Sequence, residues 1–378
     1  MSLRFIWATA LVMGLSRAAV LDLPIIVDNS YSVVEVDVGT PAKTYRFLFD
    51  TGSATSWAVD EACAKECTNF SGYDRVGYSV EGSSTGNLTG EYGSIEYFGG
   101  TTAGPIASDL MKAEGVSWNQ SFIAADISSW GNIPADGFMG MAFNSIIVGG
   151  ADTVMKTLMP QLDAPKFGIY YSAESDNSNG PSEGRLTLGR SREADFVNGK
   201  LETVTIEPRD RVYEVWASTI NSVAGTVTVD GKKIETETSF SSGRVVFDTG
   251  AGRTSLSKSQ VKGVYESIGM NWTAIIEDGY IPKCSDFNSS WSVSFSFSGQ
   301  DYNNPPVVTL TGDQLANPGF ANREDACWPP FDEGDSEGFT LIGKDILHNF
   351  YTVWDFGAKE EADYKPTLSF GKLKKGSK

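Results

Sequence analysis

The sequence predicts a mainly β protein made of two related halves. Two observations carry this prediction: glycine is frequent, at 40 of 378 residues, and one short apolar motif occurs twice. Frequent glycine, together with many serine, threonine, valine and tyrosine residues, favours short strands and turns over long helices. A chain of 378 residues is also long enough for two domains, each with a core of its own.

The repeated motif is an apolar triplet followed by Asp-Thr-Gly and a small residue, FLFDTGS at 47–53 and VVFDTGA at 245–251. Such a run indicates a buried strand that ends in a tight turn carrying an acid. A second matching element follows each copy, at residues 136–140 and 339–343. We therefore expect an N-terminal lobe over 20–205 and a C-terminal lobe over 206–378, joined in the polar stretch 202–211. Their pseudo-twofold axis would bring Asp50 and Asp248 together in a cleft between the lobes, where substrate sites are common.

The remaining pattern is mostly strand. Residues 31–38 alternate, 39–41 form a turn, and 44–49 continue as the second strand of a hairpin. Further strands are expected over 184–188 and 212–220. Two short helices are expected, over 151–162 and over 257–268, with Ser257 as the N-cap of the second.

Residues 1–19 have the features of a signal peptide: Arg4, an apolar core over 5–15, and small residues for cleavage over 16–19. That core is too short to span a bilayer, and the basic tail over 372–378 does not resemble a GPI-anchor signal. We therefore expect a secreted, extracellular protein without a membrane anchor, with a vacuole-like compartment as the alternative. Only residues 20–49 separate the cleavage site from Asp50, so no pro-segment is expected.

The net charge of −18 argues against nucleic acid as a partner. It is compatible with an acidic environment, although solubility alone explains it equally well. The four cysteines are an even number, and after a signal peptide disulfides are expected rather than free thiols or zinc ligands. Five N-x-S/T sequons are candidate glycosylation sites: Asn69, Asn87, Asn119, Asn271 and Asn288.

His348 is the one histidine of the sequence. Ser-His-Asp and Cys-His hydrolysis both need an imidazole beside the nucleophile, and histidine-ligated zinc usually needs two. His348 stands in an apolar, aromatic stretch and is expected to be structural or on the surface. If the protein is a hydrolase, carboxylates must supply its acid–base chemistry, without a metal or cofactor.

These residues resemble the pepsin-like aspartic proteases over about Tyr31 to Phe370. The likeness includes Trp57 after the first motif, a flap-like stretch around Tyr97, and the cysteine spacing. It implies the bilobal pepsin-like fold, two homologous β-rich lobes with a cleft between them. It also implies the disulfides Cys63–Cys67 and Cys284–Cys327.

The resemblance implies a monomeric aspartic endopeptidase that acts on peptides or proteins at acidic to mildly acidic pH and binds pepstatin-like inhibitors. Asp50 and Asp248 would share a proton and activate a water molecule, as the pepsin dyad does in the standard description of such pairs. The supporting roles are bracing by Thr51 and Thr249, close approach at Gly52 and Gly250, a hydrogen bond from Ser53 to Asp50, a flap tyrosine Tyr97 anchored by Trp57, and Phe138 in an apolar pocket or in the core.

The second motif departs from the family pattern at Ala251, where serine or threonine is usual. Without that hydroxyl, we expect the pair to keep its proton to higher pH. A second interpretation is a non-catalytic pepsin-like binding or inhibitor protein, but both aspartates and Tyr97 are present. A third, a glycosylated structural cell-surface protein, leaves the repeated Asp-Thr-Gly without a reason.

Overall fold

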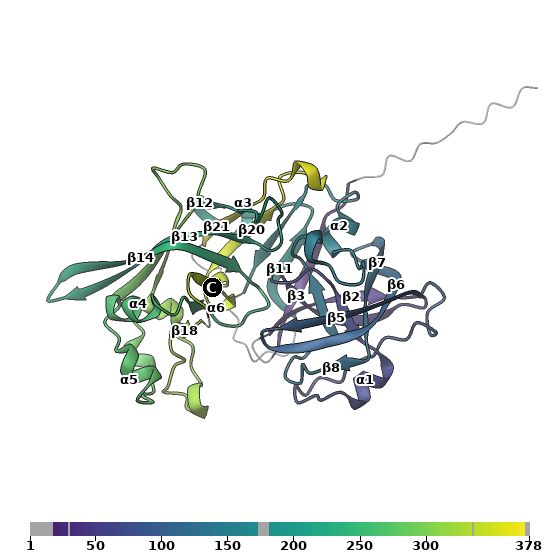
Figure 1. The fold of residues 1–378 in the computed structure, drawn as a ribbon, viewed down its shortest axis with the longest axis horizontal. Helices are drawn as coiled ribbons and strands as arrows, with labels where there is room; N and C mark the ends of the chain where they lie inside the picture. Colours follow the sequence, from purple (N-terminus) through teal and green to yellow (C-terminus); the bar gives the residue numbers. More distant parts are fainter. Residues whose placement is uncertain (1–17, 29–30, 173–180, 335, 375–378) are drawn as a thin grey trace, which may run out of the picture.

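A computed structural model describes residues 18–28, 31–172, 181–334 and 336–374 of the chain. These residues form one 14-stranded sheet and one 7-stranded sheet, with only short helices beside them (Figure 1). The mainly β, two-part prediction is therefore confirmed. The predicted signal peptide lies outside the described residues except for Ala18 and Ala19, and the Ala19 amide donates a 2.8 Å hydrogen bond to the Gln161 carbonyl.

The larger sheet contains the strands of the first half and the two last strands of the chain. They are β1 (Leu21–Asp28), β2 (Tyr31–Val38), β3 (Lys43–Asp50), β4 (Trp57–Val59), β5 (Asn87–Tyr97), β6 (Gly100–Ala113), β7 (Val116–Ala125), β8 (Ile127–Ser128), β9 (Gly137–Gly140), β10 (Lys166–Tyr170), β11 (Pro181–Leu188), β12 (Val197–Thr205), β20 (Phe350–Asp355) and β21 (Thr367–Leu373). Their order is β12-β21-β20-β10-β11-β1-β2-β3-β9-β4-β7-β6-β5, and β8 pairs with β6. Because β10 pairs with β20, and β12 with β21, this sheet continues from the first half of the sequence into the second.

The smaller sheet belongs to the second half. Its strands are β13 (Ala217–Val229), β14 (Lys232–Phe247), β15 (Ser255–Leu256), β16 (Trp291–Phe297), β17 (Val307–Thr311), β18 (Asp332–Glu333) and β19 (Phe339–Ile342). They lie in the order β17-β16-β13-β14-β19-β15-β18. In Figure 1, β13, β14 and β18 of this sheet are labelled on the left, and β2, β3, β5, β6 and β7 of the larger sheet are labelled on the right. The strand predicted over 212–220 begins only at Ala217.

The described helices are all short. The α-helices are α1 (Glu61–Glu66), α2 (Val154–Leu158), α3 (Glu193–Phe196), α4 (Val261–Ser267), α5 (Trp272–Ile276) and α6 (Lys344–Leu347), and the 3₁₀ helices are η1 (Asn144–Ile146), η2 (Cys284–Asp286), η3 (Gly312–Leu315), η4 (Phe320–Asn322) and η5 (Glu361–Asp363). The helix expected over 151–162 is α2, which Thr153 caps by accepting from the Lys156 amide. The prediction that Ser257 caps the next helix is wrong. That helix, α4, begins after Gln260, and the Ser257 hydroxyl instead accepts a 2.8 Å hydrogen bond from the Gly338 amide.

The first predicted hairpin is confirmed as β2 and β3. Its turn contains Gly39 at φ +88° and a cis Thr40–Pro41 peptide bond. The strands pair from Val33 with Leu48 to Val38 with Lys43, so β3 ends at Asp50 in the middle of the molecule.

Aromatic side chains join the two halves of the main core. Trp216, which precedes β13, is fully buried and contacts the rings of Phe143, Phe167 and Trp354 at centroid distances of 5.0, 5.8 and 5.2 Å. Its Nε1 donates a 3.0 Å hydrogen bond to the Met141 carbonyl. Burial of a tryptophan between two sheets holds both halves in one relative position.

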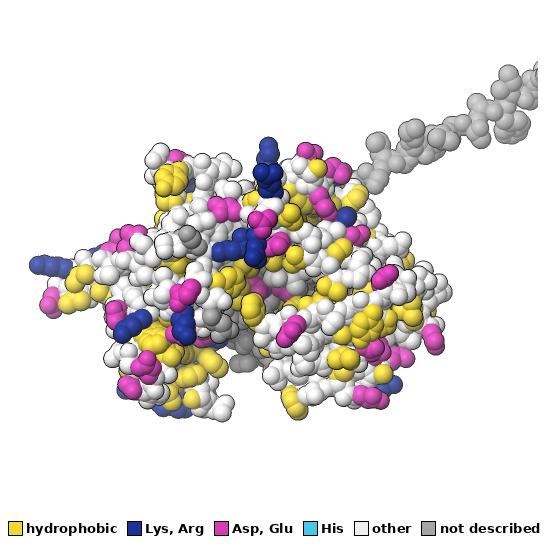
Figure 2. All heavy atoms as spheres, viewed as in Figure 1, with side chains coloured by type: hydrophobic (Ala, Val, Ile, Leu, Met, Phe, Trp, Pro, Cys, Tyr) yellow, Lys and Arg dark blue, Asp and Glu magenta, His cyan; other side chains and the backbone are white. Residues whose placement is uncertain are grey.

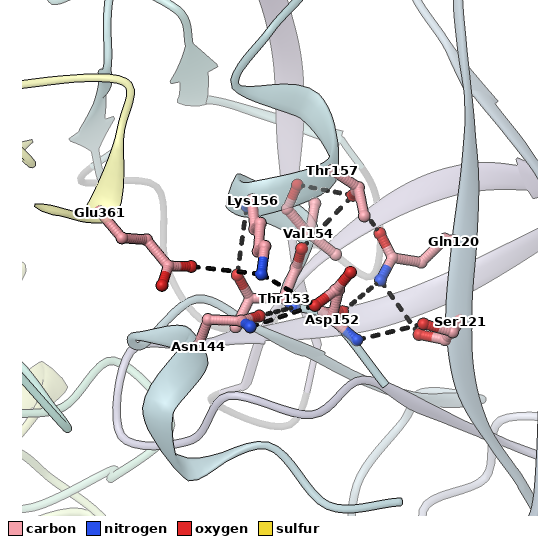
Figure 3. A network of polar contacts seen from close by, with 9 residues as sticks. All are labelled: Gln120, Ser121, Asn144, Asp152, Thr153, Val154, Lys156, Thr157 and Glu361. Atoms are coloured by element: carbon pink, nitrogen blue, oxygen red, sulfur yellow. Dashed lines mark hydrogen bonds and ion pairs between the residues drawn. The ribbon is translucent and has the colours of Figure 1, made fainter. Parts of the chain in front are cut away.

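A polar network fixes the loop between β9 and α2 (Figure 3). Asp152 accepts from Asn144 Nδ2 at 3.1 Å and lies 3.4 Å from Lys156 Nζ, which also pairs with Glu361 at 3.4 Å. Gln120 of β7 donates to the Asp152 carbonyl and accepts from Thr157. The network matters to the site because Ile146 and Val148 of the same loop line the cleft described below.

Candidate active site

The two Asp-Thr-Gly motifs occupy equivalent places in the two sheets. β3 runs parallel to β9 and places Asp50 beside Gly140, while β14 runs parallel to β19 and places Phe247 beside Ile342. The glycine that ends each matching element is required by space. A Cβ on Gly140 would lie 2.3 Å from Ala54, and one on Gly343 would lie 2.5 Å from the Arg253 carbonyl.

Thr51 and Thr249 brace the two motifs, as the resemblance implies. The Thr51 hydroxyl donates to the Phe247 carbonyl at 3.0 Å and accepts from the Thr249 amide at 3.0 Å. In the reverse direction, the Thr249 hydroxyl donates to the Phe49 carbonyl at 2.7 Å and accepts from the Thr51 amide at 3.1 Å. Both threonines are buried, so these four hydrogen bonds are shielded from water and hold the two turns against each other.

The two carboxyls lie face to face across this brace. A Cβ on Gly52 would lie 2.4 Å from Asp248 Oδ2, and a Cβ on Gly250 would lie 2.6 Å from Asp50 Oδ1. Any residue larger than glycine at either position would therefore displace the opposite carboxyl. This is the close approach that the sequence predicted for these glycines.

The hydrogen-bond donors around the two carboxyls differ. Asp50 accepts from the Gly52 amide at 2.9 Å and from the Ser53 hydroxyl at 2.5 Å. Asp248 accepts from the amides of Gly250 and Ala251 at 2.7 and 3.2 Å. Asp50 thus receives a hydroxyl donor where Asp248 receives only amides.

This difference in donors makes the pKa values of the two carboxyls unequal. Burial raises the pKa of Asp50, but the Ser53 hydroxyl and a hydrogen bond with Asp248 oppose the rise. Burial, the charge of Asp50 and their shared hydrogen bond all raise the pKa of Asp248, well above its ordinary value. Two neighbouring carboxyls cannot easily ionise together. The geometry therefore favours a shared proton that resides on Asp248 and an ionised Asp50.

The pair lies in a cleft of about 1320 Å³ between the two halves. Figure 2 shows the molecule hollowed between its halves, with acidic side-chain atoms visible inside the hollow. Among the predicted residues, those that line the cleft are Asp50, Gly52, Ser53, Tyr97, Phe138, Asp248, Gly250 and Ala251. Thr51, Trp57 and Thr249 lie behind this surface and are buried.

The β5–β6 hairpin covers one side of the cleft and carries Tyr97 at its end. The Tyr97 ring lies 5.5 Å from the ring of Phe138 and 5.5 Å from that of Trp130, and Phe138 also contacts Trp57 at 4.8 Å. The glycines after Tyr97 have a reason in this packing. A Cβ on Gly99 would lie 2.8 Å from the Trp130 ring.

The Trp57 indole and the Tyr97 hydroxyl lie close enough to interact, as expected, but their contact lacks the length and angle of an ordinary hydrogen bond. Trp57 Nε1 and the Tyr97 hydroxyl are both buried, and neither has a hydrogen-bond partner of ordinary length and angle in the described part of the chain. Burial and the charge of Asp50 raise the pKa of Tyr97, while the nearby polar groups of Ser53 and Trp57 oppose that rise. The contacts of Tyr97 are therefore mainly aromatic.

The expected disulfides, Cys63–Cys67 and Cys284–Cys327, are both present. Of the five sequon asparagines, four are exposed and Asn69 is half-buried. Asn69 Nδ2 donates a 2.8 Å hydrogen bond to the Tyr73 carbonyl, which engages the nitrogen that would carry a glycan. The exposed asparagines are therefore better placed for modification than Asn69.

His348 lies at the edge of the cleft and is half-buried. Its Nδ1 is 2.7 Å from the Lys344 carbonyl, one turn earlier in the chain. No group of three or more His, Cys, Asp or Glu side chains that could hold a metal ion occurs in the described residues. The helices of the described ranges are too short to cross a membrane.

Several residues that line the cleft were not predicted, and four of them bear on its chemistry. Trp130, Tyr171, Arg244 and Asp345 all line the cleft. Alternation back from Asp248 along its strand indicates Arg244, because side chains two and four residues apart share a face. The glycine pair after Tyr97 indicates a bulky neighbour such as Trp130. Tyr171 and Asp345 have no such signal in the sequence.

Comparison with known proteins agrees with this geometry. A model of the family described as eukaryotic aspartyl protease matches residues 31–361. The chain is 25% identical to pepsin A of Sus scrofa over 329 residues, which cover 85% of this chain and 77% of that protein. It is 26% identical to cathepsin E-A of Xenopus laevis over 357 residues, which cover 90% of this chain and 81% of that protein. The protein belongs to the eukaryotic aspartyl protease family, and its architecture is the pepsin-like bilobal fold.

Proposed function

We propose that this protein is an aspartic endopeptidase that hydrolyses peptide bonds with a water molecule held between Asp50 and Asp248. The observation that carries the proposal is the pair itself. Two carboxyls, one from each half, face each other in a cleft of about 1320 Å³. Four hydrogen bonds made by Thr51 and Thr249 hold the two turns that carry them together. Family membership agrees with this activity.

The protonation of the pair suggests a role for each carboxyl. Ionised Asp50 takes a proton from the water, whose oxygen attacks the carbonyl carbon of the scissile peptide bond. Asp248 donates its proton to the carbonyl oxygen, and a tetrahedral diol forms without a covalent link to the enzyme. Collapse of the diol breaks the carbon–nitrogen bond, and a proton passes from the Asp50 carboxyl to the leaving amine. A diol hydroxyl proton returns to Asp248, so the pair regains its starting state.

The hairpin that carries Tyr97 supports binding of an extended peptide. Tyr97, Trp130 and Phe138 together make an apolar, aromatic surface beside Asp50. A peptide enclosed there loses water around its scissile bond, which strengthens the electrostatic interactions of the pair. We therefore expect apolar residues next to the scissile bond.

We further propose that the enzyme acts outside the cell as a glycosylated monomer at acidic to mildly acidic pH. Two disulfides and four exposed sequon asparagines support an extracellular location. The raised pKa values of both aspartates support activity below neutral pH, because the pair must keep one proton.

Digestion of acid-denatured haemoglobin between pH 3 and pH 6, with and without pepstatin, tests the activity. The wild-type protein should release peptides and pepstatin should stop it. Asp50→Asn and Asp248→Asn should each lose activity while keeping the thermal unfolding temperature close to that of the wild type. Asp325→Asn is the matched control, because Asp325 is exposed, pairs with Arg323 and does not line the cleft.

A folded wild-type protein that cuts no substrate at any of these pH values would contradict the proposal. If it still bound pepstatin, the second interpretation, a pepsin-like binding protein, would be favoured. If Asp325→Asn lost activity to the same extent as Asp50→Asn, the assay would report folding rather than chemistry.

A further inference from the structure

One wall of the cleft is a regular piece of sheet formed by β14 and β19. Arg244 and Val246 of β14 and Asp248 directly after it line the cleft, while Val245 and Phe247 between them belong to the buried core. On β19, Phe339 and Leu341 line the cleft, and Thr340 and Ile342 are buried. This is the alternation that a strand with one buried face must show.

The register of the two strands orders the wall. Arg244 lies beside Phe339, and Val246 lies beside Leu341. From Asp248 outward, the wall therefore presents a carboxyl, then an apolar pair, then a cation beside a phenylalanine. Strands rise about 3.3 Å per residue, so the backbone of Arg244 is about 13 Å from that of Asp248.

The first half of the molecule provides a comparison, because Arg46 precedes Asp50 by the same four residues. Arg46 is neutralised. It lies 3.6 Å from Asp28 and 3.2 Å from Glu35, and its guanidinium covers the Tyr73 ring at 4.7 Å. Arg244 is half-buried at the cleft and forms no ion pair with any described carboxylate. The equivalent arginines thus have different surroundings, and only Arg244 faces the substrate space.

Further cations line the cleft. Arg253 also lines the cleft, but Asp332 holds it through two 2.7 Å hydrogen bonds. Lys344 also lines the cleft, from the beginning of α6. In Figure 2, lysine or arginine side chains lie along the rim of the hollow.

We propose that Arg244 binds a carboxylate side chain of the substrate, three or four residues from the scissile bond. The inference rests on the proposed endopeptidase function and names its substrate class, an extended peptide with an acidic residue at that distance. An extended peptide advances by the same rise per residue as the wall, so its apolar residue meets Val246 and Leu341 before its acidic residue meets Arg244. Arginine and a carboxylate form a charge-assisted, two-pronged hydrogen bond that lysine or a neutral side chain does not reproduce.

Paired peptide substrates test the proposal. Each pair differs only by glutamate or glutamine, placed in turn at the second to fifth residue on either side of the scissile bond. At pH 5.5 the substrate glutamate is ionised, and kcat/KM should favour it over glutamine by about tenfold at the third or fourth residue on one side. At pH 3, where the glutamate is protonated, the preference should disappear.

Two variants of Arg244 make the assignment specific. Arg244→Gln should abolish the glutamate preference, so that the ratio of kcat/KM for the glutamate peptide to that for the glutamine peptide falls from about ten to about one. Arg244→Glu should favour lysine at the same position. Arg323→Gln is the matched control, because it removes one positive charge from a surface site and should keep the glutamate preference intact.

Equal kcat/KM for glutamate and glutamine at every position would overturn the inference and leave the proposed function standing. A preference that survives Arg244→Gln would overturn it too, because the carboxylate would then have another partner. Binding of the same peptides to Asp50→Asn separates the two proposals. Tighter binding of the glutamate peptide, without cleavage of any peptide by the wild type, would support the subsite and contradict the endopeptidase function.

Discussion

The Ser53 hydroxyl lies 2.5 Å from Asp50 Oδ2, and at the equivalent place beside Asp248 the chain has Ala251. Ser53 stabilises the ionised form of Asp50, whereas Asp248 has backbone amides alone as donors. The two halves share one motif, but this difference makes the two carboxyls unequal. The proton of the pair therefore has a preferred place, and a change of donor beside either carboxyl should shift the pH profile of the pair.

A hydroxyl added at position 251 should move the alkaline limb of the pH profile to lower pH. In Ala251→Ser, an extra donor to Asp248 would favour its ionised form and lower its pKa, so the pair would lose its last proton sooner. One hydrogen bond of ordinary strength corresponds to a shift of about one pH unit. The measurement is kcat/KM from pH 2 to pH 8 on a substrate without ionisable side chains.

Ser53→Ala should change the other limb. Asp50 ionises first, and without the Ser53 donor its pKa should rise, so the acid limb should move upward by about one pH unit while the alkaline limb stays. If instead Ser53→Ala moved the alkaline limb and Ala251→Ser moved the acid limb, the shared proton would reside on Asp50.

The threonine brace should contribute to both stability and rate. Thr51→Ala removes two hydrogen bonds and leaves the Phe247 carbonyl and the Thr249 amide unpaired in a buried place. We expect the free energy of unfolding to fall by about 2–3 kcal/mol, measured by urea denaturation, and kcat to fall because the carboxyls lose their alignment. Thr51→Ser keeps the hydroxyl and is the matched control. A Thr51→Ala protein with wild-type stability and kcat would show that the brace is dispensable.

Asp345 should make the protein more stable in acid. Burial raises its pKa from 3.8 to about 6, against the opposing hydrogen bonds from Thr254 and the charge of Arg253. Between these two values the folded protein binds a proton that the unfolded chain has released, so stability falls as pH rises. The stabilisation is fully present below about pH 4 and is lost as pH passes 6. Asp345 also borders the cleft, where water screens its charge. We therefore expect it to contribute about 2 kcal/mol to the free energy of unfolding in acid, less than the full pKa shift would give.

Urea denaturation at pH 4 and at pH 6.5 measures this contribution. From pH 4 to pH 6.5, the free energy of unfolding of the wild type should fall by about 2 kcal/mol more than that of Asp345→Asn. Asp210→Asn, at an exposed loop position with φ +49° that asparagine tolerates, is the control and should match the wild type. An equal pH dependence in Asp345→Asn and wild type would contradict the assignment.

The part of the site that could be predicted is the part specified by short sequence motifs, and the part that could not depends on contacts between segments distant in the sequence. Asp50, Asp248 and their supporting residues belong to short motifs that occur twice, so the sequence itself placed them in equivalent surroundings. Arg244 was within reach of the same argument, since it shares a strand face with Asp248. That Arg46 is neutralised and Arg244 is not depends on Asp28, Glu35 and Tyr73, whose contacts with Arg46 are not visible in the sequence.

The elements followed the same rule. The alternating β2 strand was predicted with its observed bounds, because its pattern is local. Ser257 was wrongly placed as a helix cap because its hydroxyl binds the amide of Gly338, 81 residues later in the chain. The pairing of β10 with β20 across the two halves likewise depends on contacts between distant segments.

The hydroxyl of Tyr171 provides the last prediction. It is buried beside the cleft without a hydrogen-bond partner among the described residues, and its ring stacks on Phe49 at 6.2 Å. Burial first, and then the charge of Asp248, raises its pKa. A buried hydroxyl without a partner destabilises the folded state, so Tyr171→Phe should leave the free energy of unfolding unchanged or raise it by up to about 1 kcal/mol.

Tyr265→Phe is the matched control for that substitution. The Tyr265 hydroxyl is also buried, but it donates a 2.5 Å hydrogen bond to the Phe331 carbonyl, so its removal should cost about 1–3 kcal/mol. Urea denaturation of both variants at pH 5 gives the comparison. If Tyr171→Phe lost as much stability as Tyr265→Phe, the Tyr171 hydroxyl would have a partner in solution. A parallel shift of the alkaline limb of kcat/KM would then identify that interaction as one that reaches Asp248.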